Sequence, residues 1–75
     1  MIIYPNPGKG LFTIEMTKIP NNSSIEIFNL LGKKVYSQVM NSSKIVMNLK
    51  LQSGIYFVNI CDPKGQMQAK RMIIR

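Results

Sequence analysis

The segment IYFVNICDPKGQMQAKRMIIR, residues 55–75, decides the fold because it reads as two strands joined by a tight turn. Its opening run, IYFVNIC, consists almost entirely of β-branched and aromatic residues, which predicts a central strand buried on both faces. Asp62, Pro63 and Gly65 follow at the offsets of a type I turn with a glycine bulge. The last strand, MQAKRMIIR, then reaches the end of the sequence. This order is typical of an antiparallel β protein.

Apolar and polar residues alternate with a period of two along most of the chain before this segment. In SIEIFNL, Ile25 and Ile27 face inward. Phe28 and Leu30 make the opposite face apolar as well, so we expect this strand to be covered on both sides near its end. Gly32 marks the hairpin turn that follows. Six or seven strands at intervals of roughly ten residues, with no helical window, predict an all-β fold, a small antiparallel immunoglobulin-like β-sandwich.

Length and composition predict one small domain with a noncovalent core. The chain has 75 residues, 45% of them hydrophobic, and a mean hydropathy of +0.02. A domain of this size buries only about 60% of the surface that its unfolded chain exposes. The single cysteine, Cys61, cannot form an internal disulfide and is expected to be a small apolar core residue.

The positive charge of the chain does not by itself indicate a nucleic-acid partner. Ten Lys and Arg residues stand against three Asp and Glu residues, for a net charge of +7. The basic residues are dispersed, and no array of aromatic residues interleaves with them, so we expect no specific nucleic-acid partner. The sequence also has no run of 18 apolar residues and therefore predicts no transmembrane segment.

The residues needed for catalysis or for metal binding are nearly absent. The sequence has no histidine, and its only acidic side chains are Glu15, Glu26 and Asp62. The glutamates fall on polar faces of strands, and Asp62 suits the first position of its turn. We therefore expect no catalytic residue, no metal site and no cofactor, and conclude that the chain is not an enzyme.

The opening stretch IIYPNPGKG combines the stiffest and the most permissive residues. Pro5 and Pro7 fix their own backbone and hold the preceding residues extended. Gly8 and Gly10 can adopt φ values that other residues resist, which predicts an extended entry that ends in an abrupt turn. Such an entry suits a module that follows another domain.

The end of the sequence, KRMIIR, leaves two alternatives open. Its apolar residues either complete the sandwich or bind another protein through a strand that offers both main-chain and side-chain contacts. The second alternative makes this tail the candidate partner-binding site. The residues concerned are Lys70, Arg71, Met72, Ile73, Ile74 and Arg75.

Four stretches resemble the C-terminal sorting domain, type A, of proteins exported by the type IX (Por) secretion system of Bacteroidetes. They are YPNPGKGLFTIEM, IEIFNLLGKKVY, LQSGIYFVNI and KRMIIR, in the order of the family and over nearly the whole chain. Besides the basic and aliphatic tail, the family motifs fall on Pro5, Asn6, Pro7, Gly10, Gly32, Leu51, Gly54 and Tyr56. We expect Gly54 to supply an unusual φ or a close approach, and Tyr56 to pack with its hydroxyl at the rim.

The resemblance implies a non-catalytic signal for export. Residues 1–75 would form one sorting domain at the end of a larger secreted protein, behind an N-terminal cargo domain. An outer-membrane translocon would recognise the domain after the protein had entered the periplasm, and a sortase-like C-terminal signal peptidase would usually remove it. The cargo would then reside at the cell surface or outside the cell. Two alternatives remain: a stand-alone carbohydrate- or protein-binding β-sandwich, and a small basic nucleic-acid binder, whose affinity would fall steeply with salt.

Overall fold

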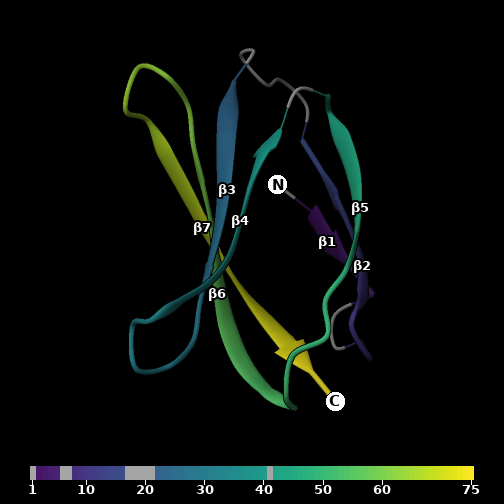
Figure 1. Ribbon diagram of the computed structural model, residues 1–75. Coiled ribbons are helices and arrows are strands. Elements are labelled where there is room, and N and C mark those ends of the chain that lie inside the picture. The colour runs from purple at the N-terminus through teal and green to yellow at the C-terminus, as the bar shows by residue number, and fades with distance from the viewer. Residues whose placement is uncertain (1, 6–7, 17–21, 41) are drawn as a thin grey trace.

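Seven strands and no helix make up the part of the chain that the computed structural model describes, residues 2–5, 8–16, 22–40 and 42–75 (Figure 1). The strands are β1 (Ile2–Tyr4), β2 (Leu11–Glu15), β3 (Ser23–Phe28), β4 (Lys34–Met40), β5 (Lys44–Asn48), β6 (Gly54–Cys61) and β7 (Met67–Ile74). Their alternating burial follows from the period of two in the sequence, because successive side chains of a strand point to opposite faces.

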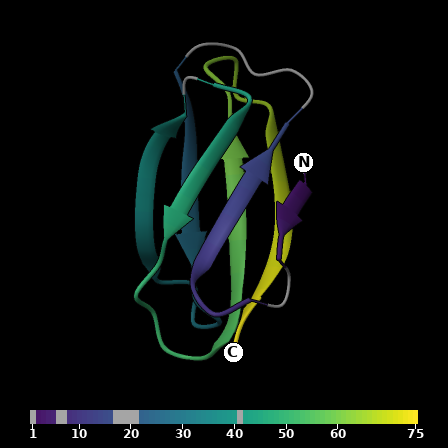
Figure 2. The same cartoon turned by 90° about the vertical axis from the view of Figure 1, so that its right-hand side faces the viewer.

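The strands form two antiparallel sheets that face each other (Figures 1 and 2). The smaller sheet has the order β1-β2-β5, and the larger has the order β4-β3-β6-β7. Each of the five strand pairings is antiparallel. The prediction of a small antiparallel β-sandwich is therefore confirmed.

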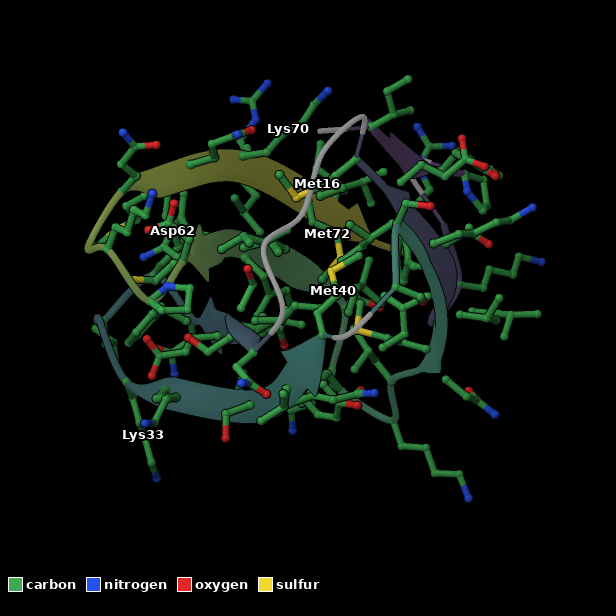
Figure 3. The ribbon with its side chains drawn as sticks, turned by 90° about the horizontal axis from the view of Figure 1, so that it is seen from above. Met16, Lys33, Met40, Asp62, Lys70 and Met72 are labelled. Carbon is green, nitrogen blue, oxygen red and sulfur yellow. The ribbon has the colours of Figure 1, made fainter. Side chains whose placement is uncertain are left out.

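The core lies between the two sheets and takes side chains from every strand. Methionines fill a large part of it: Figure 3 shows Met16, Met40 and Met72 turned toward one another between the sheets. Their unbranched, flexible side chains suit a space bounded by two twisted sheets. The buried apolar residues are Ile3, Phe12, Ile14, Ile25, Ile27, Met40, Met47, Leu49, Tyr56, Val58, Ile60, Met72 and Ile74.

Strand β6 is buried on one face only, so the prediction that it is buried on both faces is wrong. It is central in its sheet, between β3 and β7, but only the face with Tyr56, Val58 and Ile60 is buried. Phe57, on the other face, is 40% exposed. Because a two-layer sandwich covers only one face of each sheet, a continuous run of apolar residues does not mean that a third layer covers the other face. For the same reason the expected cover at the end of β3 is wrong: Leu30 lies in the turn after β3 and is 65% exposed.

The turn between β6 and β7 has the predicted form. The backbone N–H of Gly65 donates to the carbonyl of Asp62 at 3.0 Å, and Gly65 has a φ of 85°. The Asp62 carboxylate oxygen Oδ1 accepts from the backbone N–H groups of Lys64, at 3.0 Å, and Gln66, at 2.8 Å. One short acidic side chain thus satisfies two turn donors.

The turn between β3 and β4 is built in the same way around an asparagine. The Asn29 Oδ1 accepts from the N–H groups of Leu31 and Lys33, each at 3.0 Å. Gly32, with a φ of 85°, donates its N–H to the Asn29 carbonyl at 3.0 Å. The two hairpins of the larger sheet therefore share one turn geometry.

The shared geometry predicts how Asp62 responds to substitution. Asp62→Ala removes the acceptor of two backbone N–H groups and should lower the free energy of unfolding by about 1 kcal/mol, measured by urea denaturation. Asp62→Asn should stay close to the wild type, because Asn29 makes the same pair of bonds in the other turn. Equal losses in the two variants would show that the carboxylate does not act through these bonds.

Candidate functional site

Hydrogen bonds join the opening loop to the end of the last strand. The N–H of Gly8 donates to the carbonyl of Ile73 at 3.0 Å, and the N–H of Arg75 donates to the carbonyl of Gly8 at 2.7 Å. Together they form a parallel bridge between Gly8 and Ile74. Two segments that the sequence suggested separately, the glycine-rich entry and the basic, aliphatic tail, thus form one site.

Gly8 is required at this junction because no side chain fits. A Cβ at Gly8 would lie 2.8 Å from the carbonyl oxygen of Pro5 and 2.9 Å from Cε1 of the buried Phe12 ring. An unusual φ, which the sequence predicted for Gly8, does not explain this glycine, because its φ is not in the positive region. The close approach of the loop backbone to β7 and to the core is the constraint.

Gly10 joins the same loop to the chain after β5, and here the predicted unusual backbone is present. Its φ is 117°, and a Cβ would lie 2.5 Å from the carbonyl oxygen of Leu49. The carbonyl of Gly10 accepts the N–H of Leu49 at 2.7 Å. The loop is thus held from both sides, by the end of β7 and by the segment that follows β5.

The tail divides into buried and exposed residues. Met72 is fully buried and Ile74 is 3% exposed, so both belong to the core. This corrects the expectation that they contact a partner of the folded domain, because the opposing sheet covers them. Ile73 is half-buried, and its carbonyl is bonded to Gly8. The exposed members of the tail are Lys70, Arg71 and Arg75.

The remaining motif residues have mainly structural positions. Pro5 is exposed, Asn6 and Pro7 lie outside the described residues, and Gly32 occupies its turn. Leu51 is half-buried against the core. Tyr56 is 8% exposed and donates its hydroxyl hydrogen to the carbonyl of Gln52 at 2.7 Å, as expected of a packed residue with a polar tip at the rim.

Gly54 meets neither of the requirements predicted for it. Its φ lies outside the positive region, and a Cβ would contact only Cε2 of Tyr56, at an ordinary 3.8 Å. It pairs with Ile74 in the ladder between β6 and β7. The structure offers no local reason for a glycine here.

The junction carries positive charge. Lys9 lies between the two bonded glycines, Lys50 follows the bonded Leu49, and Arg75 is itself bonded to Gly8; all three are exposed. The acidic side chains are engaged elsewhere. Asp62 serves its turn, and within the described part of the chain Glu26 pairs with Lys34 at 3.0 Å and Glu15 pairs with Lys44 at 3.6 Å.

No arrangement suited to catalysis or metal binding occurs in the described part of the chain. Among residues 2–5, 8–16, 22–40 and 42–75 there is no group of three His, Cys, Asp or Glu side chains that could hold a metal ion. On the smaller sheet, a hydrogen bond to the Glu15 carboxylate raises the pKa of the exposed Tyr4. No helix within the described ranges is long and apolar enough to cross a membrane.

Comparisons with known proteins give a consistent result. The family model of the secretion system C-terminal sorting domain matches residues 2–75. Ulvan lyase NLR42 of Nonlabens ulvanivorans is 34% identical over 74 residues, which are 96% of this chain and 14% of the lyase. PorZ, a surface component of the type-IX secretion system of Porphyromonas gingivalis, has a solved structure that matches with a TM-score of 0.82. That match covers 99% of this chain and 11% of PorZ at 21% identity, and it shows the shared fold. The chain thus spans a small part of the length of both proteins.

Substitution of Gly8 should loosen the junction. Gly8→Ala places a methyl group against backbone and a buried ring, and we expect a loss of roughly 1–3 kcal/mol in the free energy of unfolding. Faster hydrogen exchange at the Arg75 amide should accompany it. Gly54→Ala is the matched control, expected within about 0.5 kcal/mol of the wild type. A Gly8 variant as stable as the Gly54 variant, with the Arg75 amide still protected, would contradict the assignment.

Proposed function

We propose a recognition surface for this chain, which belongs to the family of secretion system C-terminal sorting domains, the sorting signals of type IX secretion. The surface is the junction of the opening loop and the tail, and the export machinery would bind the domain there. The domain directs the protein that carries it to the cell surface or the extracellular space. The family match over residues 2–75 is the observation that carries this function.

We further propose that residues 1–75 are one domain of a longer polypeptide whose preceding part is the cargo. The match to a small segment of a longer lyase supports this view. The cargo would cross the outer membrane from the periplasm through a translocon, and a signal peptidase would then remove the sorting domain. The domain itself contributes a folded surface and no catalytic step.

The recognition surface that we propose consists of the exposed part of the tail and the loop bonded to it. Lys70, Arg71 and Arg75 are exposed on the tail, and Lys9 extends the positive surface onto the loop. Because Met72 and Ile74 fix β7 in the core, they position these cations rather than contact the partner. A complementary partner surface would carry carboxylates, which favours fast and specific association.

Export of a reporter tests this proposal. The domain is fused behind a secretory signal and a reporter enzyme in a bacterium with type IX secretion, and surface delivery and thermal unfolding are both measured. Lys9→Glu combined with Arg75→Glu, at two exposed positions of the junction, should lower delivery about tenfold or more while the unfolding temperature stays unchanged. Lys64→Glu, an exposed charge reversal in the turn between β6 and β7, should leave both unchanged.

Truncation would not separate recognition from folding, because loss of residues 71–75 also removes Met72 and Ile74 from the core. Met72→Ala should cost about 2–5 kcal/mol of stability, as other buried methionine truncations do, and should reduce delivery through unfolding. If the doubly charge-reversed variant is delivered as well as the Lys64 variant, the tail does not carry the recognition. If the unaltered fusion stays inside the cell, the chain is not a sorting signal in that organism.

A further inference from the structure

The turn between β3 and β4 presents two leucines to solvent, which we call the leucine tip, Leu30 and Leu31. Leu30 is 65% exposed and Leu31 is 94% exposed, the highest value for a large apolar side chain among the residues that the structure describes. Figure 1 shows this hairpin projecting from the larger sheet, away from the smaller one. The leucines add nothing to the core of the sandwich.

The backbone that carries the leucine tip is held firmly. Asn29 fixes it with its side chain, through Leu31 and Lys33, and with its main chain, which accepts the N–H of Gly32 and donates to the carbonyl of Lys33, each at 3.0 Å. An apolar anchor on an ordered backbone loses little conformational entropy on binding.

The other hairpin of the same sheet shows that the turn itself does not require leucine. Pro63 and Lys64 occupy the two corresponding positions, between Asp62 and Gly65, and the same set of hydrogen bonds forms there. The geometry depends on the Asx residue at the first position and the glycine at the fourth. The turn geometry therefore does not account for the two leucines, which remain exposed without contributing to the core.

The charges beside the tip indicate the partner. Lys33 is exposed and points away from the body of the domain (Figure 3), and Lys34 follows it, paired with Glu26 at 3.0 Å. Two projecting leucines beside a cation fit an apolar pocket with an acidic rim. A membrane surface is the less suitable occupant, because membrane binding scales with buried apolar area and only two side chains project here.

We propose that the leucine tip docks into an apolar, acid-rimmed pocket on a protein of the export machinery. This contact is separate in sequence from the tail and would give the domain a second point of attachment. Two weak contacts on one rigid domain raise each other's effective concentration. The inference rests on the proposed sorting function.

The two matched turns supply the variants for the test. Leu31→Lys gives the first turn one residue of the second, and Leu30→Pro combined with Leu31→Lys gives it both. The thermal unfolding temperature should change in neither variant. Delivery of the reporter fusion should fall about tenfold or more, as expected for loss of a binding hot spot. Lys64→Leu, which adds an exposed leucine to the other turn, should be delivered like the wild type.

Site-specific cross-linking identifies the occupant. A photoreactive residue at position 31 should form an adduct with an outer-membrane secretion protein in cells, and the same residue at position 64 should not. Undiminished delivery of the Leu31 variants, or the same adducts from both positions, would overturn the proposal. Binding of the unaltered domain to vesicles of phosphatidylglycerol, lost in Leu31→Lys, would assign the tip to a membrane instead and would also overturn it.

The outcomes separate this inference from the sorting function. A wild-type fusion that is not exported refutes the sorting function. A wild-type fusion that is exported together with fully exported Leu31 variants refutes only the role of the leucine tip.

Discussion

Two hydrogen bonds at Gly8 connect the beginning of the chain to its end, and much of the structure depends on them. Gly8 lies in the loop between β1 and β2 of the smaller sheet, whereas Ile73 and Arg75 belong to the end of β7 in the larger sheet. The bonds therefore tie together the two sheets, whose facing sides pack through side chains. They also cover the end of an edge strand, whose open backbone groups are a general liability for unwanted pairing.

This closure explains why the terminal strand is ordered in a domain without a disulfide. Chain ends fray unless they are tied down, and β7 is held by its ladder to β6, by Met72 and Ile74 in the core, and by Gly8 at its edge. A tail held in this way presents Lys70, Arg71 and Arg75 on a fixed backbone. Order at the end of the chain and display of its charges are consequences of the same contacts.

The alternation of residues was enough to predict the sandwich, the inward face of β3 and the turn at Asp62, because each depends on local chemistry. The role of Gly8 could not be predicted, since it arises from contact with residues at the opposite end of the sequence. The two-sided burial expected for β6 failed for a related reason: Phe57 is as apolar as a core residue, and only the number of layers decides whether it is covered. In the tail, MIIR gave no clear alternation, so the division between buried Met72 and half-buried Ile73 emerged only from the register with β6.

The two turns of the larger sheet show which residues the fold leaves free. Asn29 with Gly32, and Asp62 with Gly65, satisfy the backbone in the same way, so the pair of residues between them is unconstrained by the turn. One turn carries Pro63 and Lys64, which are ordinary for a solvated loop, and the other carries Leu30 and Leu31. Because the two turns share one geometry, that geometry does not explain why one pair is apolar and the other is not, and the exposure of Leu30 and Leu31 is the observation from which the docking proposal starts.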